Sequence, residues 1–188
     1  ECIIGPFSVK WLPITHSLPE PCGLVITTPV GKVFHTGDWK LDSNPVVGEG
    51  VNYDYFKHLA TQDIDAMVCD STNALKHGNS VSESACEAGL YHYINSAPKR
   101  VVVACFASNI ARLITIARIA QQTQRRMAVF GRSLVNMIGI ARRTGYWPED
   151  CQLIDRRHVG YLPEEEVLIV ATGSQGEPKA ALNQLAKD

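Results

Sequence analysis

The chain has 188 residues, of which 45% are hydrophobic and 20% charged, and this composition is ordinary for a folded protein of one or two domains. Its formal net charge of −1 argues weakly against a protein that coats nucleic acid through an overall basic field, and it permits a local phosphate-binding cleft. No apolar run approaches the length of a membrane span and no signal peptide is visible, so we expect a cytoplasmic protein without membrane contact.

The six cysteines are scattered along the chain and form no C-x-x-C pair. Some lie in apolar runs, as in Ala104-Cys105-Phe106. A domain of this size does not need disulfides for stability, so we interpret the cysteines as free thiols in a reducing compartment.

The N-terminal part of the chain is predicted to be rich in strands. Short apolar or alternating runs are typical of strands, and they occur at Phe7–Leu12, Cys22–Thr28, Lys32–His35 and Ala66–Cys69. The sequence Thr28-Pro29-Val30-Gly31 indicates a turn between the second and third of these runs. A short helix is predicted over Val51–Ala60.

From Ser80 onward, predicted helices and strands alternate. Ser80-Val81-Ser82-Glu83 has the S-x-x-E pattern of a capping box. Helices are predicted over Cys86–Ala97, Ile110–Ala120, Ser133–Thr144 and Ala180–Lys187, the last with Pro178 in its first turn, and strands over Val101–Phe106, Met127–Phe130 and Val167–Ala171. This alternation predicts an α/β fold with a mainly parallel sheet flanked by helices. We therefore expect one domain over residues 1–79 and a second over residues 80–188.

Three predicted strand-to-helix junctions carry small polar residues. They are Phe106–Asn109, Gly131–Ser133 and Thr172–Pro178. Free N–H groups at a helix N-terminus attract anions, and open α/β sheets bind ligands at the carboxyl ends of their strands. Taken singly, Ser108 and Ser133 are better explained as N-caps. The third junction combines glycines, a serine and a glutamine, which one cap does not require, so it is a candidate phosphate site.

Two residues in the strand-rich part have the chemistry of zinc ligands. His16 follows a predicted strand and Asp38 closes the run His35-Thr36-Gly37-Asp38. Zinc takes imidazole nitrogen and carboxylate oxygen, but a site needs three or four protein ligands. On these residues alone, a surface histidine in a turn is the better interpretation of His16.

The order of several short strings resembles ribonuclease J of the metallo-β-lactamase/β-CASP family. The strings are His-Ser-x-Pro-Glu from His16, His-Thr-Gly-Asp-Trp-Lys from His35, Asp-Ser-Thr-Asn-Ala from Asp70, Phe-Ala-Ser-Asn from Phe106, Gly-Arg-Ser from Gly131 and Thr-Gly-Ser-Gln-Gly-Glu-Pro from Thr172. Each string is weakly specific, but six in order are strongly specific. The resemblance extends from about Gly5 to Ala186.

The resemblance implies a zinc-dependent ribonuclease with two Zn²⁺ ions per active site. It implies part of a metallo-β-lactamase αββα domain over residues 1–79, followed by a β-CASP domain over residues 80–188. His16 would ligate one zinc, Asp38 would bridge both, and Asp70 would orient a catalytic histidine supplied elsewhere. His35 is interpreted as structural. The candidate RNA contacts implied in the second domain are Ser108, Asn109, Arg132, Ser133, Gly173, Ser174 and Gln175.

The family's H-x-H-x-D-H motif does not occur in this chain. We therefore expect a fragment that holds zinc weakly and is inactive alone. RNA is the expected partner, and the resemblance also allows a homo-oligomer. Two other functions remain open on the residues: a non-catalytic RNA- or nucleotide-binding module, and a metallo-β-lactamase-fold hydrolase of a small metabolite.

Overall fold

The computed structural model describes residues 1–187, and the chain divides into two compact units, Glu1–Ser82 and Glu83–Asp188. Each unit has its own sheet. No helix among residues 1–187 is both long and apolar enough to cross a lipid bilayer.

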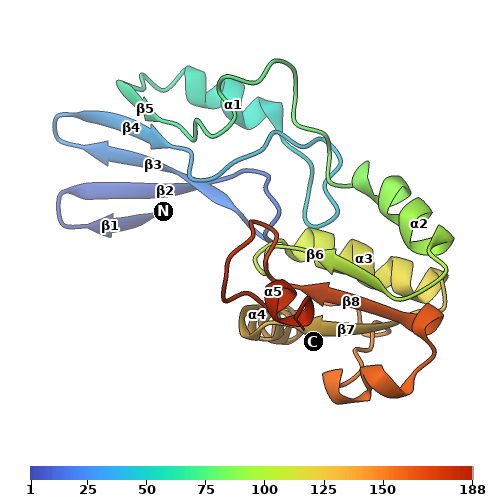
Figure 1. The fold of residues 1–188 in the computed structure, drawn as a ribbon. Coiled ribbons are helices and arrows are strands. Elements are labelled where there is room, and N and C mark those ends of the chain that lie inside the picture. The colour runs from blue at the N-terminus through green and yellow to red at the C-terminus, as the bar shows by residue number, and fades with distance from the viewer. Residues whose placement is uncertain (188) are drawn as a thin grey trace. The chain divides into compact units, whose positions relative to one another are not determined.

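The first unit is built on a five-stranded sheet in the order β1-β2-β3-β4-β5 (Figure 1). The strands are β1 Cys2–Ile4, β2 Phe7–Pro13, β3 Cys22–Thr28, β4 Gly31–His35 and β5 Ala66–Val68. Neighbouring strands are antiparallel except β4 and β5, which are parallel. The helix α1, Tyr53–Ala60, packs its buried Leu59 against Leu12, Val25 and Phe34 of the sheet. These four side chains form the small core of this unit.

The second unit contains a three-stranded parallel sheet in the order β6-β8-β7. Its strands are β6 Val101–Ala104, β7 Arg126–Phe130 and β8 Val167–Ala171. Its helices are α2 Cys86–Ser96, α3 Ile110–Gln122, α4 Arg132–Arg143 and α5 Ala181–Leu185, with 3₁₀ turns η1 at Arg156–Tyr161 and η2 at Glu164–Glu166.

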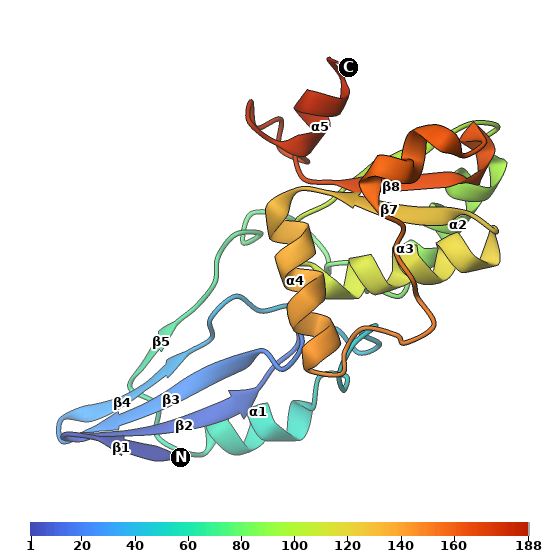
Figure 2. The same ribbon diagram turned by 90° about the horizontal axis from the view of Figure 1, so that it is seen from below.

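Helical segments cover both faces of this parallel sheet (Figure 2). Every residue of the central strand β8 is buried, which explains its uninterrupted apolar run. Val167 and Ile169 point to one face, where Val159 of η1 and Leu182 of α5 pack against them. The other face is covered by α3 and α4. The predicted parallel sheet with helices on both faces is therefore confirmed.

Two local predictions were wrong, and three short elements were not predicted. The predicted capping box does not form, because α2 begins at Cys86 with Ala85 as its N-cap and has no side-chain cap. Pro178 does not start the last helix, which begins three residues later at Ala181. The predictions also omitted β1, η1 and η2, which are short segments without a distinct apolar period.

Candidate functional site

Three strand ends of the first unit bring the predicted metal-site residues into one region. Thr15 and His16 follow β2, the loop with Asp38 follows β4, and Asp70 follows β5. The backbone N–H of Lys40 donates to the carbonyl of Thr15 at 2.8 Å. The N–H of Asp70 donates to the Thr36 hydroxyl at 3.0 Å, and this bond joins the segment after β5 to the loop after β4.

Asp70 is held as a carboxylate by its surroundings. Its Oδ1 accepts hydrogen bonds from the Thr72 hydroxyl at 2.6 Å and from the Thr72 N–H at 2.9 Å. These two bonds, followed by the Trp39 N–H and the nearby His16, lower the pKa of Asp70 below its usual value. An ionised carboxylate at this position can accept a hydrogen bond from an imidazole, which is the role that the resemblance implies.

The residues of this region supply only part of a metal site. Across residues 1–187, no group of three or more His, Cys, Asp or Glu side chains is arranged to hold an ion. Asp38 is exposed and His16 is half-buried. The His16 ring lies beside the Ser17 hydroxyl, 3.3 Å from Nδ1. His35, predicted to be structural, accepts the Gly37 N–H through Nδ1 at 3.0 Å. The donor types suit zinc, but the set is incomplete among residues 1–187.

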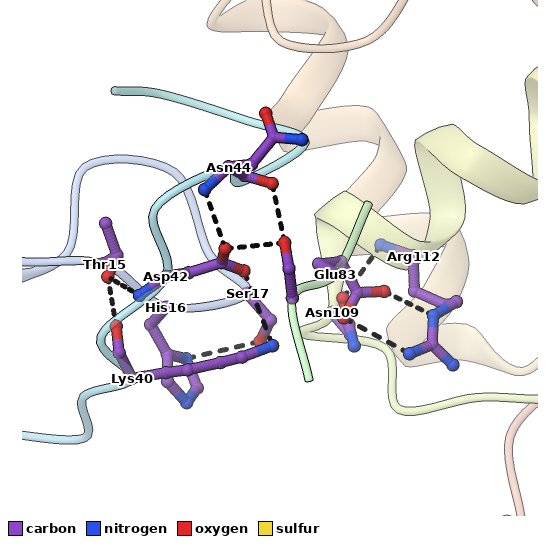
Figure 3. A network of polar contacts seen from close by, with 10 residues as sticks. Thr15, His16, Ser17, Lys40, Asp42, Asn44, Glu83, Asn109 and Arg112 are labelled. Atoms are coloured by element: carbon purple, nitrogen blue, oxygen red, sulfur yellow. Dashed lines mark hydrogen bonds and ion pairs between the residues drawn. The ribbon is translucent and has the colours of Figure 1, made fainter. Parts of the chain in front are cut away.

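A buried carboxylate, Asp42, organises the loop that follows Asp38 (Figure 3). Its Oδ1 accepts the Asn44 N–H at 3.0 Å and the Ser82 hydroxyl at 2.6 Å. Lys40 Nζ lies 3.5 Å from its other oxygen. Because Ser82 is the last residue of the first unit, this carboxylate ties the end of that unit to the loop carrying Asp38. Sequence reasoning did not identify Asp42, since an isolated Asp in a loop carries no pattern.

In the second unit, Glu83 pairs with Arg112 of α3 through two hydrogen bonds, one from Nε and one from a terminal nitrogen at 3.2 Å (Figure 3). Glu83 is buried, with 7% of its surface exposed. The bond to Glu83 is the main cause that raises the pKa of Arg112 above its usual value. A charge-assisted pair with two bonds fixes orientation as well as position. Glu83, predicted to cap α2, instead holds the start of the second unit to α3.

The three predicted phosphate-binding junctions leave the parallel sheet at one edge. Ala171 at the end of β8 is in register with Ala104 of β6 and with Phe130 of β7. The residues that follow stay paired: Cys105 donates its N–H to Ala171, and Thr172 donates its N–H to Phe130, at 3.0 and 3.1 Å. The structure therefore places all three junctions at the carboxyl ends of neighbouring parallel strands. The alternation of strands and helices in the sequence predicted this placement.

The serines at these junctions are not N-caps. Asn109 caps α3, because its side-chain oxygen accepts the Arg112 N–H at 2.9 Å. Gly131 is the N-cap of α4, so the exposed Ser133 lies within the first turn of that helix. Ser108 and Ser174 are exposed as well. The N-cap interpretation of Ser108 and Ser133 was wrong, and both hydroxyls face solvent at the sheet edge.

Glycine is required at the start of α4 by close packing. Gly131 has φ 129° and ψ 128°, and a Cβ there would lie 2.7 Å from Thr172 Oγ1 and 2.8 Å from Thr172 Cγ2. Gly173 has φ +122°, and a Cβ on it would lie 2.9 Å from the Cβ atoms of Ala180 and Leu182. The two glycines allow the β7 and β8 junctions to lie against each other. They thereby position Arg132 beside the Thr172 loop.

A pocket of about 600 Å³ opens at this edge, between the start of α4, η1 and the loop before α5. Arg132, Arg156 and Lys179 are among the residues that line it. Sequence reasoning identified Arg132 through its junction but missed the other two cations. Arg156 lies in a segment that carries no motif and Lys179 lies one residue beyond the Thr172–Pro178 string, and the fold brings both to the pocket. Gln175 is exposed, and its N–H is held by Glu177 at 3.1 Å.

Comparison with known proteins bears on both units. Residues 98–188 match the family described as "Ribonuclease J, beta-CASP domain". The whole chain is similar to ribonuclease J of Sinorhizobium meliloti, with 39% identity over 98% of this chain and 33% of the relative. It is also similar to ribonuclease J of Mycolicibacterium smegmatis, with 38% identity over 97% of this chain and 33% of the relative. The predicted resemblance to ribonuclease J is thereby confirmed.

The chain spans about a third of the length of these relatives, 33% for the first two and 31% for ribonuclease J of Thermus thermophilus, which is 37% identical over 96% of this chain. Among solved structures, a protein of unknown function from Enterococcus faecalis is similar with a TM-score of 0.58 and 16% identity, covering 90% of this chain and 42% of that one. At this identity the likeness concerns the fold alone.

Proposed function

We propose, from the match of residues 98–188 to the β-CASP domain of ribonuclease J, that the chain is part of a zinc-dependent ribonuclease that hydrolyses RNA phosphodiester bonds. In this proposal residues 1–79 belong to a metallo-β-lactamase domain and the later residues grip the RNA strand. The cytoplasm, where RNA processing and decay take place, is the compartment that the proposal implies.

One observation supports RNA binding most directly: three polar junctions meet at one edge of a parallel sheet, beside an arginine. Their exposed hydroxyls and the N–H groups at the start of α4 are donors suited to phosphate oxygens. Arg132 adds a charge that grips a phosphate with two hydrogen bonds. A net charge of −1 does not conflict with this, because only a local cluster of donors is required.

The metal part of the proposal assigns His16 and Asp38 as two of the zinc ligands and Asp70 as the acceptor for a histidine. The remaining ligands would be supplied by residues outside this chain. Calorimetric titration of the 188-residue chain with Zn²⁺ tests this part. We expect weak binding, since tetrahedral sites need more ligands than two. Tight stoichiometric binding would show that the ligand assignment is wrong.

RNA binding is tested by filter binding of single-stranded RNA at two salt concentrations. Replacing Arg132 by Ala is expected to lower affinity and to reduce the slope of log affinity against log salt by about 1, because one fewer phosphate is neutralised. Replacing Ser174 by Ala should have less effect, since a hydroxyl carries no charge. If both variants alter the melting temperature but not RNA affinity, the junctions have a purely structural role and the proposal fails.

A further inference from the structure

Two buried hydroxyl groups adjoin the proposed metal-site residues of the first unit. Thr15 is 4% exposed and Thr36 is fully buried. The candidate residues are more accessible, since Asp38 is exposed and His16 and Asp70 are half-buried. A hydroxyl is costly to bury unless it forms hydrogen bonds, so the partners of these two groups show what their burial achieves. Both bind backbone groups of the segments that carry the candidate residues.

Thr36 joins the loop after β4 to the segment after β5. Its hydroxyl accepts the Asp70 N–H at 3.0 Å and donates to the Gly37 carbonyl at 2.7 Å. Its own N–H donates to the Val68 carbonyl at 2.9 Å, which continues the pairing of β4 with β5. The Gly37 carbonyl belongs to the peptide bond that precedes Asp38. One hydroxyl therefore fixes both the backbone immediately before Asp38 and the N–H of Asp70.

Thr15 joins the end of β2 to the same loop after β4 (Figure 3). Its hydroxyl donates to the Lys40 carbonyl and accepts the Asp42 N–H at 2.9 Å, and its carbonyl accepts the Lys40 N–H at 2.8 Å. His16 is the next residue in the chain, and Asp38 lies two residues before Lys40. These bonds therefore limit how far the backbone at His16 can move from the backbone at Asp38.

We propose that Thr15 and Thr36 are positioning residues of the proposed metal site. Their hydroxyls hold the loops of His16, Asp38 and Asp70 in the arrangement that binds a divalent cation, and neither hydroxyl is itself a ligand. This inference rests on the metal part of the proposed function. Hydrogen-bond partners behind the ligands of a metal site change its affinity about 10–100-fold, so the loss of either hydroxyl should weaken binding.

The test replaces each of the two threonines by valine, which has the same shape without the hydroxyl, and by serine, which keeps the hydroxyl. The matched control is Thr28→Val. The Thr28 hydroxyl forms hydrogen bonds with Val30 and Gly31, but it does so in the turn at the opposite end of β4. The control therefore removes a bonded hydroxyl from the same unit without touching the loops of the candidate site.

Mn²⁺ is the probe, added to the isotope-labelled 188-residue chain and followed by nuclear magnetic resonance. Its unpaired electrons broaden the amide signals of residues near the place where it binds, so weak binding is detectable. Mn²⁺ also favours carboxylate ligands over thiolates, which avoids competition from the exposed Cys22 and Cys69.

In the parent chain we expect Mn²⁺ to broaden the amide signals of His16 and Asp38 at a lower concentration than that of Asp150, an exposed carboxylate of the second unit. Thr15→Val and Thr36→Val should each raise the concentration required at His16 and Asp38 by about tenfold. The serine variants and the control should keep the parent value.

Amide hydrogen exchange tests the Thr36 bond without any metal. The Asp70 N–H should exchange about 2–10-fold faster in Thr36→Val than in the parent chain, because it loses its hydroxyl acceptor. Thr36→Ser should restore the parent rate. An unchanged rate in Thr36→Val would show that this hydroxyl does not hold Asp70, and the positioning role of Thr36 would be overturned.

The Mn²⁺ measurement separates this inference from the function on which it rests. If Mn²⁺ prefers His16 and Asp38 in the parent chain but both valine variants behave like Thr28→Val, the positioning role is wrong and the metal part of the proposed function stands. If Mn²⁺ shows no such preference in the parent chain, the metal part of the proposed function fails and the positioning role fails with it. Melting curves of all variants verify that each one is folded.

Discussion

Replacing Gly131 by Ala and Gly139 by Ala makes the same chemical change at the start and in the middle of one helix, and we expect opposite effects on stability. Gly131 has φ 129°, and an added Cβ would approach Thr172 Oγ1 to 2.7 Å. Gly139 lies inside α4, where an added Cβ would meet only the tip of Arg143, at 3.7 Å. The first site excludes a side chain and the second accepts one.

The magnitudes follow from these geometries. A residue other than glycine held in a sparsely populated backbone region costs about 1–3 kcal/mol, and inserting a methyl group into a tight contact costs about 1–3 kcal/mol more. We therefore expect Gly131→Ala to lower the free energy of unfolding by about 2–6 kcal/mol. Alanine exceeds glycine in helix propensity by about 1 kcal/mol, so Gly139→Ala should raise the free energy of unfolding by about that amount.

Urea unfolding followed by tryptophan fluorescence measures both effects. The chain has three tryptophans, of which Trp147 alone lies in the second unit, where it is buried at 5% exposure after α4. Replacing Trp11 and Trp39 by Phe in every variant makes the signal report on that unit. Unchanged stability of Gly131→Ala would refute the argument from φ and the Thr172 contact. A destabilised Gly139→Ala would refute the assignment of α4 as a regular helix at that position.

Three further outcomes are expected from local contacts. Asn109→Ala removes the N-cap of α3 and should cost about 1 kcal/mol in urea unfolding, with Asn109→Asp retaining most of the stability. Glu83→Ala leaves the half-buried Arg112 without its bidentate partner and should lower the free energy of unfolding by about 2–3 kcal/mol. An unchanged urea midpoint would show that the pair does not stabilise the fold. Burial raises the pKa of Cys105 to about 11, so at pH 8 about one thousandth of this thiol is ionised. A thiol reagent should therefore modify the exposed Cys22 and Cys69 first and Cys105 only in denaturant.

Much of the fold was predictable because local periodicity reports local geometry. The apolar run Val167–Ala171 and the helical spacing from Ile110 gave elements whose bounds the structure reproduces within a few residues. The same order of elements placed three polar junctions at the carboxyl ends of parallel strands. The resemblance to ribonuclease J also rested on sequence alone, since short strings in a preserved order do not require coordinates.

The tertiary structure decided which distant residues meet. The pattern around Glu83 predicted a capping box with Ser80, three residues away, but the half-buried guanidinium of Arg112 offers the Glu83 carboxylate a cationic partner and two hydrogen bonds instead of one. The strand order β6-β8-β7 places the last strand between the earlier two, and no local pattern encodes that pairing. It is this order that brings Arg156 and Lys179 to the pocket beside Arg132. Contacts over such separations depend on how sheets and helices pack, and packing is a property of the whole unit rather than of any stretch of sequence.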